Sequence, residues 1–292
     1  AVRKAFRDRG LTNTGFTNEY RVVLRATRED LDHPFDLMVA AHDRVELAST
    51  SHRGQVYAEL IQRWRANCTT TSGSGGSTMG TPPFGASSKG SGGPTPATAM
   101  VMVAGTVQYR LIVPASLASP APLLIVFSGT EGGSTMSQNL LSVAAVTKSG
   151  GFVRAVLDGV KYNGQGAAGA TVLDAVRKLY DIDNDRTYLL GESAGTSAAL
   201  QLGFSLRQPY FAAYWANDIN ATGSPAATAA QLGFKPWGQV GPGGQQGIAS
   251  QIVSGMKDAG YRLDNPSPYS GPGATTHGDP NQFVAAVSWF NG

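Results

Sequence analysis

Ser193 is the residue whose place in the sequence best fits an enzyme nucleophile. It lies in the pentapeptide GESAG, residues 191–195, after the apolar run TYLL and before the helix-like stretch TSAALQL. A serine hydroxyl is a weak nucleophile, so it needs a neighbouring base and donors aimed at the developing oxyanion. A G-x-S-x-G motif between a strand and a helix places the serine on a tight turn, where the two glycines permit close packing. The motif therefore predicts nucleophilic catalysis by Ser193.

His277 is the residue that we expect to act as the base. Three of the four histidines, His33, His42 and His52, lie in the charged N-terminal part of the chain, and their spacings match no metal-ligand pattern. His277 lies downstream of Ser193 in the small-residue stretch GATTHGDP. This position agrees with the chain order serine, acid, histidine.

Three carboxylates between Ser193 and His277 are candidates for the acid that orients the base: Asp218, Asp258 and Asp264. Asp218 follows the strand-like stretch FAAYWAN, and the sites of α/β sheets form at the carboxyl ends of the strands. Asp258 lies near the end of a predicted helix, and Asp264 lies in a turn setting. We favour Asp218, with Asp264, Asp258 and a missing acid as the alternatives.

Two backbone amides are expected to stabilise the oxyanion. One is the N–H of Ala194, directly after the nucleophile, and the other is the N–H of Thr130 in the glycine-rich loop of LLIVFSGTEGG. Three aromatic residues near predicted loop ends could line a substrate pocket or pack in the core: Trp215, Trp237 and Tyr269.

Strand-like and helix-like stretches alternate from about residue 99 onward. MVMVAGTVQYRLIVP predicts two strands around Gly105, and PLLIVFSG is a continuous apolar run typical of a strand covered on both faces. GATVLDAVRKLY and QQGIASQIVSGMKDAG predict helices, and PNQFVAAVSWF predicts a last helix with Asp279 as N-cap and Pro280 at its first position. The order predicts an α/β fold with a mostly parallel, doubly covered sheet.

The first 67 residues differ in composition from the rest of the chain. They contain 20 of the 43 charged side chains but only three of the 37 glycines. We expect residues 1–67 to form a small charged α+β segment of unknown function, in which GQVYAELIQRWRA is an amphipathic helix. The Gly/Ser/Thr/Pro-rich residues 68–98 predict a disordered linker. Residues 99–292 are then the catalytic domain.

Charge and composition argue against several other classes of protein. The net charge of +3 is not gathered into a Lys/Arg block, which makes nucleic acid a poor candidate partner. The single cysteine, Cys68, excludes an intrachain disulfide. No apolar run approaches the roughly 18 residues of a membrane span. The linker composition is commoner in exported proteins, so we expect a secreted or cell-envelope location; the sequence does not indicate an oligomeric state.

Residues from about 100 to 292 resemble the α/β-hydrolase superfamily. Within them, VLDAVRKLYDIDNDRTYLLGESAG is similar to the poly(3-hydroxybutyrate) depolymerase and feruloyl esterase-like group, and QPYFAAYWA resembles the strand entry that follows in that group. The resemblance implies an α/β-hydrolase fold with Ser193 as nucleophile and His277 as base. It also implies a carboxylic ester substrate, often a polyester or a plant-wall ester, and no metal or organic cofactor.

The chain departs from that group in one place. The stretch PWGQVGPGGQQG, where the group usually carries its acid, contains no carboxylate. Either the acid has moved one strand earlier, to Asp218, or the triad is incomplete. We therefore expect a serine esterase that forms an acyl-enzyme, and the alternative is a catalytically weak hydrolase-fold protein with a binding role.

Overall fold

The described residues belong to one of two units of the chain. The computed structural model describes residues 85–94 and 98–292. All of them lie in the unit Thr78–Gly292, and the other unit is Ala1–Ser77. The predicted charged segment 1–67, with its amphipathic helix, and Cys68 lie outside the described residues.

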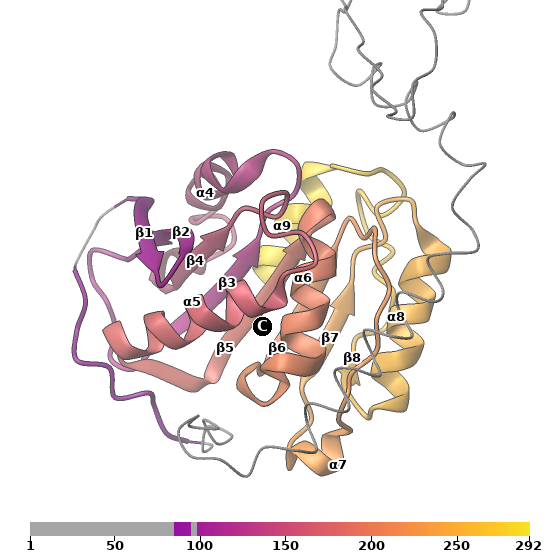
Figure 1. Ribbon diagram of the computed structural model, residues 1–292. Helices are drawn as coiled ribbons and strands as arrows, with labels where there is room; N and C mark the ends of the chain where they lie inside the picture. The colour runs from indigo at the N-terminus through magenta and orange to yellow at the C-terminus, as the bar shows by residue number, and fades with distance from the viewer. Residues whose placement is uncertain (1–84, 95–97) are drawn as a thin grey trace, which may run out of the picture. The chain divides into compact units, whose positions relative to one another are not determined.

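Eight strands within the described residues form one sheet (Figure 1). Their order across the sheet is β1-β2-β4-β3-β5-β6-β7-β8. The strands are β1 (Met100–Ala104), β2 (Val107–Ile112), β3 (Ala121–Phe127), β4 (Val153–Leu157), β5 (Ile182–Glu192), β6 (Ala213–Asn217), β7 (Trp237–Val240) and β8 (Arg262–Leu263). Strand β2 is antiparallel to both of its neighbours, and the pairs from β4 to β8 are parallel. The mostly parallel sheet predicted from the sequence is confirmed.

The central strands bring three chain segments together at one edge of the sheet. Strand β3 is buried along its whole length, as its continuous apolar sequence predicted. Strand β5 lies between β3 and β6, with Phe127 paired to Gly191 and Glu192 paired to Asn217. Because these strands are parallel, the residues that follow each of them are neighbours in space.

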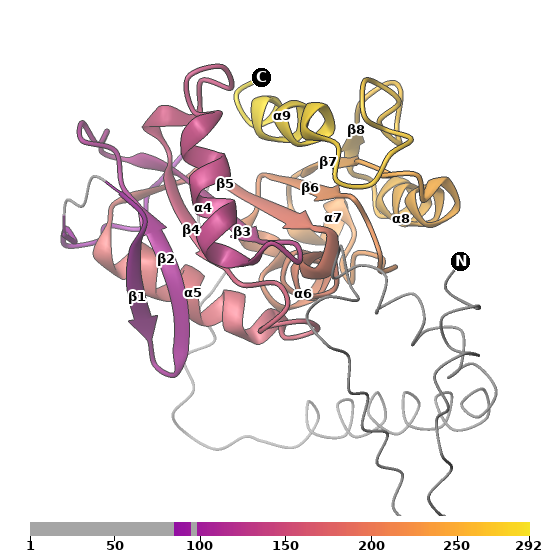
Figure 2. The same cartoon turned by 90° about the horizontal axis from the view of Figure 1, so that it is seen from above.

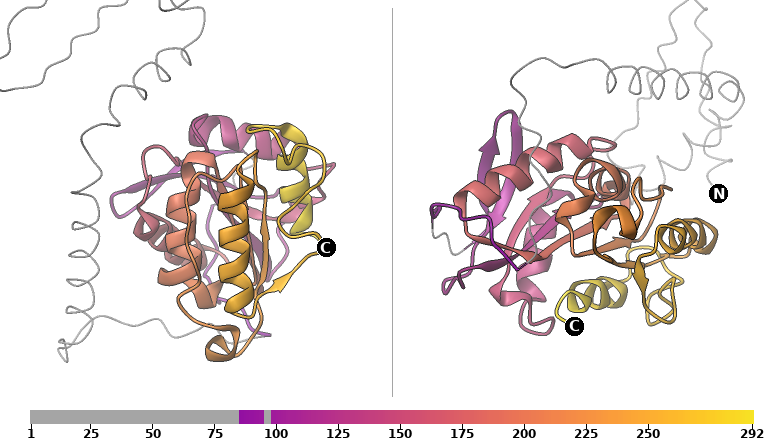
Figure 3. Two further views of the ribbon diagram at one scale, coloured as in Figure 1. Left: turned by 90° about the vertical axis from the view of Figure 1, so that its right-hand side faces the viewer. Right: turned by 90° about the horizontal axis from the view of Figure 1, so that it is seen from below.

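Helices cover both faces of the sheet (Figures 2 and 3). On one face lie α4 (Gly132–Ser142) and α9 (Pro280–Trp289), and on the other lie α5 (Gly166–Leu179), α6 (Thr196–Gln201) and α8 (Gln246–Asp258). Shorter turns of helix occur at Ser149–Gly151, Ser193–Gly195, Leu202–Leu206, Gln208–Tyr210 and α7 (Ala229–Leu232). Helix α9 begins as predicted: Asp279 accepts a hydrogen bond from the N–H of Asn281, and Pro280 is at the first position.

Two apolar cores result from this layering. Successive residues of a strand point to opposite faces. Thus Leu123 and Ile125 of β3 belong to the core beneath α5, α6 and α8, whereas Leu124 and Val126 belong to the core beneath α4 and α9. The sheet is buried on both faces at its centre, where the strands that end near Ser193 lie.

Residues 85–94 are held against the residues that lead into β5. The N–H of Ser88 donates to the Ile182 carbonyl (2.8 Å), and its Oγ donates to the Tyr180 carbonyl (2.8 Å). Gly90 packs so closely that a Cβ there would lie 2.2 Å from the Tyr180 carbonyl oxygen. The prediction of a disordered linker is therefore wrong for residues 85–94, because small residues that bury little apolar surface can still pair with exposed backbone.

Candidate active site

Ser193 lies in the tight turn between β5 and α6. Its φ of +43° is in the left-handed region, which is uncommon for a residue with a side chain. The turn packs closely on β3, since a Cβ at Gly195 would lie 2.6 Å from the Cβ of Phe127. Ser193 is 9% exposed. The strand, turn and helix that the sequence predicted around this serine are therefore present.

His277 contacts the hydroxyl of Ser193. Its Nε2 lies 2.8 Å from Ser193 Oγ. The imidazole belongs to the exposed loop between β8 and α9, so segments that are 84 residues apart in the chain meet at this point. This distance is within the reach that a general base needs to remove a proton from a hydroxyl.

Asp218 is buried beside the loop that carries His277. It follows β6 with a φ of +45° and is 1% exposed. Its Oδ2 accepts a hydrogen bond from the N–H of Gly278, and its Oδ1 accepts one from the Gln282 side-chain amide, each at 2.6 Å. Within the described residues, no hydrogen bond joins the carboxylate to the His277 ring. Asp218 instead binds the backbone of Gly278, the residue that follows the histidine.

The other two candidate acids lie in different surroundings. Asp264, after β8, accepts a hydrogen bond from the indole N–H of Trp289 on α9. Asp258 is the last residue of α8 and is exposed to solvent. Of the three carboxylates, Asp218 is the one that the fold places against the histidine loop.

The loop after β7, which contains GPGGQQG, packs directly against Asp218. Gly243 has a φ of +50°, and a Cβ there would lie 2.3 Å from Asp218 Oδ1. The space beside this loop is thus filled by Asp218, the residue that follows β6. The Gly243 N–H also donates to Gln282 Oε1 (3.1 Å). Gln282 therefore links the β7 loop to Asp218, because its amide oxygen accepts from Gly243 and its amide nitrogen donates to Asp218. The sequence did not indicate this role.

The glycine-rich loop after β3 contacts the nucleophile. A Cβ at Gly129 would lie 3.2 Å from the Cβ of Ser193. The Gly129 N–H donates to Glu131 Oε1 (2.9 Å), which closes the loop around Thr130. Ala194 is the second residue of the turn Ser193–Gly195, and its N–H has no partner inside that turn. Both expected oxyanion donors therefore lie on segments that adjoin Ser193.

Two further carboxyl groups lie close to the site. Glu131 is an exposed residue, but its carboxyl group lies against Gly129. Partial burial of this group raises its pKa, while hydrogen bonds from its own backbone and that of Gly129 act in the opposite direction. Glu192, directly before the nucleophile, is 7% exposed. Burial, followed by the negative charge of Asp218, holds the pKa of the Glu192 carboxyl well above its usual range. The sequence showed Glu192 only as the variable position of G-x-S-x-G.

Trp215 is part of the core and cannot line a substrate pocket. It is 2% exposed, and its indole N–H donates to Asn217 Oδ1 (2.9 Å). The ring of Tyr269 packs on it, with the ring centroids 5.5 Å apart. The prediction that placed Trp215 in a pocket is wrong, because the residue lies inside β6 rather than at its end.

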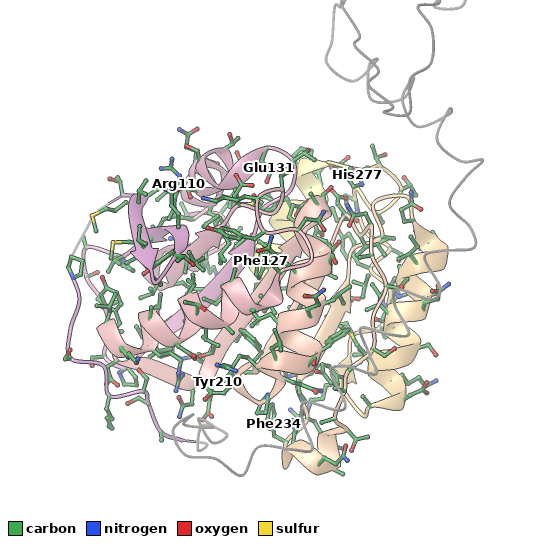
Figure 4. The ribbon with its side chains drawn as sticks, in the orientation of Figure 1. Arg110, Phe127, Glu131, Tyr210, Phe234 and His277 are labelled. Carbon is green, nitrogen blue, oxygen red and sulfur yellow. The ribbon has the colours of Figure 1, made fainter. Side chains whose placement is uncertain are left out.

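Trp237 lies at the other end of the sheet. It is the first residue of β7 and pairs with Ala213, the first residue of β6, whereas Asp218 follows the last. The ring is 41% exposed, and the Arg262 guanidinium lies 5.4 Å from its centroid. Figure 4 shows the two ends of the sheet, with His277 at the upper end and Phe234, close to Trp237 in the chain, at the lower end. The predicted pocket role of Trp237 is therefore also wrong.

Across residues 85–94 and 98–292, no group of three or more His, Cys, Asp or Glu side chains is placed to hold a metal ion. None of the helices in these residues has the length and hydropathy of a membrane span.

Several solved structures are similar to this chain. LpqC, a poly(3-hydroxybutyrate) depolymerase from Bordetella parapertussis, is similar with a TM-score of 0.50 and 15% identity, over 68% of this chain and 91% of LpqC. The chain has an α/β-hydrolase fold. Two further solved structures are similar to this chain: a thermostable esterase (TM-score 0.47, 16% identity) and FphF, a fluorophosphonate-binding serine hydrolase of Staphylococcus aureus (TM-score 0.47, 12% identity).

The extent of these similarities differs between the solved structures. The esterase is similar over 66% of this chain, and the chain spans only 60% of that esterase. FphF is similar over 68% of this chain and the whole of its own length. No protein-family model matches the sequence, and no curated protein matches it either.

Proposed function

We propose that this protein is a serine hydrolase that cleaves carboxylic esters through an acyl-enzyme intermediate. The proposal is carried by the 2.8 Å distance between Ser193 Oγ and His277 Nε2. It is supported by the left-handed turn that presents the serine between strand and helix. A hydroxyl in contact with an imidazole can lose its proton as it attacks, which is what makes a serine nucleophilic.

The acylation step uses the serine, the histidine and the two amides. Ser193 Oγ attacks the ester carbonyl carbon while His277 takes the hydroxyl proton, and the carbonyl oxygen becomes an oxyanion. The N–H groups of Ala194 and Thr130 donate hydrogen bonds to that oxygen. The bond to the alcohol oxygen then breaks, and His277 returns its proton to the leaving alkoxide. The products are an acyl ester of Ser193 and a free alcohol.

Deacylation repeats the same chemistry with water as the nucleophile. His277 removes a proton from water as it attacks the acyl carbon, and then protonates Ser193 Oγ as the acid is released. In both steps the imidazole becomes positively charged. The buried carboxylate of Asp218, anchored to the N–H of Gly278 at 2.6 Å, is the group that would stabilise this charge.

The substrate class that we propose is a polyester or a plant-wall or other short-chain ester. Two observations support it: the similarity of residues 172–195 to the depolymerase and feruloyl esterase-like group, and the fold shared with the depolymerase LpqC. Both Thr130 and His277 are exposed, so the site opens at the surface, where a chain of linked esters can reach it. Hydrolysis of p-nitrophenyl esters, hydroxyalkanoate polymer and feruloyl esters, compared side by side, tests the class.

A fluorophosphonate probe tests the reaction itself. We expect the native protein to be labelled and Ser193→Ala to remain unlabelled, because the probe reacts with an activated serine. Ser197→Ala, which removes a partly buried hydroxyl from the following helix, is the matched control and should be labelled like the native protein. An unlabelled native protein, or equal labelling of Ser193→Ala, would contradict the proposal and favour a binding role.

A further inference from the structure

Two buried carboxyl groups meet beneath the nucleophile. Glu192 ends β5 and Asp218 follows β6; they are 7% and 1% exposed. Glu192 pairs with Asn217, the residue directly before Asp218, so the two carboxyl groups are neighbours at the ends of adjacent strands. Neither group forms a salt bridge within the described residues. Two buried carboxyl groups that lie close together without a cationic partner are costly to ionise together, and a hydrogen bond between them requires a proton on one of the two.

The hydrogen bonds around Glu192 leave it free to carry that proton. The indole of Trp215 can only donate, so its bond to Asn217 Oδ1 fixes which end of the amide is which. The Asn217 Nδ2 therefore points the other way and donates to Glu192 Oε2 at 2.9 Å. One carboxyl oxygen of Glu192 is thus an acceptor, and its other oxygen remains for the bond with Asp218.

The partners of Asp218 mark it as the ionised member of the pair. Both of its oxygens accept hydrogen bonds at 2.6 Å, one from the Gly278 N–H and one from the Gln282 side-chain amide. Donors to both oxygens stabilise a carboxylate. In agreement with this assignment, burial and the charge of Asp218 raise the pKa of Glu192. Of the two groups, Glu192 is therefore the one in which a proton is expected.

We propose that Glu192 is a positioning residue of the proposed hydrolysis: as a neutral acid it donates a hydrogen bond to Asp218 and holds that carboxylate, still ionised, against the histidine loop. The inference rests on the proposed function, because Asp218 matters to catalysis only if Ser193 and His277 react. An ionised Glu192 would repel Asp218 at contact distance in a buried setting. A neutral donor instead adds a third hydrogen bond to the acid.

Substitutions at Glu192 can separate the effect of its hydrogen-bond donor from the effect of its side-chain volume. Glutamine has the same shape, can donate to Asp218 and can accept from Asn217, but it cannot ionise. Leucine fills similar space and can do neither. We expect Glu192→Gln to retain kcat on p-nitrophenyl butyrate within roughly tenfold of the native value, and Glu192→Leu to lose roughly 10²-fold, part of the roughly 10⁴-fold that loss of the acid itself costs.

An infrared difference spectrum locates the proton directly. The carbonyl band of a neutral carboxylic acid is separate from the carboxylate bands, so at neutral pH the native protein should show an acid band that is missing in Glu192→Gln. Other titratable groups near Glu192 are Asp218, directly after β6, Glu131 on the loop after β3, and His277. Glu131→Gln is the matched control, because the pKa of Glu131 is also raised by burial. This control should keep the acid band.

Three results would overturn the proposal. The first is an acid band that disappears in Glu131→Gln but persists in Glu192→Gln. The second is a native spectrum that shows no carboxylic acid band. The third is a Glu192→Gln enzyme whose kcat is as low as that of Glu192→Leu. If Glu192→Leu fails to fold, as judged by circular dichroism, the glutamine variant and the spectra still decide. Fluorophosphonate labelling of the native protein distinguishes these failures from failure of the hydrolase itself.

Discussion

Ser193 and Asp218 share a backbone conformation that few residues with side chains adopt. Their φ values are +43° and +45°, and each follows directly after the paired strand residues Glu192 and Asn217. Such conformations cost on the order of 1–3 kcal/mol and persist only where the surrounding structure holds them. Two neighbouring strands, β5 and β6, are therefore each followed by a residue in the same strained backbone conformation. One turn presents the nucleophile, and the other buries the proposed acid beside the base.

Asp218→Asn is expected to lower kcat on p-nitrophenyl acetate by roughly 10³- to 10⁴-fold, because an amide cannot stabilise the imidazolium that forms in each step. Asp264→Asn is the control. It removes a carboxylate that is bound to the Trp289 indole, so it should lower the Tm and leave kcat close to the native value. A native kcat in Asp218→Asn would move the role of acid to Asp264 or Asp258.

The residues of the site differed in how visible they were in the sequence. Ser193 lies in a local motif, and His277 is the single histidine after residue 52, so both could be predicted without knowledge of contacts. Glu192 and Gln282 could not, because the hydrogen bond of Gln282 to Asp218 and the proposed role of Glu192 beside Asp218 both depend on contacts between distant segments of the chain. A buried glutamate and a helical glutamine carry no sequence signal that separates them from ordinary polar residues.

At the scale of elements, a predicted site residue could reach the site only if it lay at the carboxyl end of its strand. Asp218 was favoured because it follows a strand at the carboxyl edge of the sheet, and the fold places it there. Trp237 was placed near a loop end without regard to strand direction, and it begins β7 at the opposite edge. In a parallel sheet the direction of a strand determines which of its flanking residues can meet the site.

The β7 loop yields a prediction of its own. Gly243→Ala should lower both kcat and the Tm, because the left-handed conformation costs a residue with a Cβ about 1–2 kcal/mol, and this Cβ would lie 2.3 Å from Asp218 Oδ1. Gly247→Ala is the matched control. It lies in α8 with open space around it, so alanine there should raise stability by up to about 1 kcal/mol and leave kcat close to the native value. Equal effects of the two substitutions would mean that the loop does not shape the site.

For the molecule as a whole, composition predicted the layered domain better than it predicted where that domain starts. Alternating strands and helices were enough to indicate a doubly covered sheet, because burial leaves a strong apolar pattern. The residues from 85 to 94 have no such pattern. Their attachment depends on backbone groups, such as the N–H of Ser88 that donates to Ile182, and on the close approach of Gly90 to Tyr180. Composition does not record contacts of this kind.

The stability of the whole molecule should depend on pH through Glu192. Folding raises the pKa of this carboxyl from its ordinary 4.5, so above about that pH the folded protein binds more protons than the unfolded chain. The stabilisation by the protonated group is complete below that pH and is lost as pH rises through the folded-state pKa. Because glutamine cannot ionise, the free energy of unfolding of Glu192→Gln relative to the native protein should increase by up to ~1.4 kcal/mol per pH unit. Urea unfolding at about pH 5 to 8 measures this difference, and a difference independent of pH would show that folding leaves the ionisation of Glu192 unchanged.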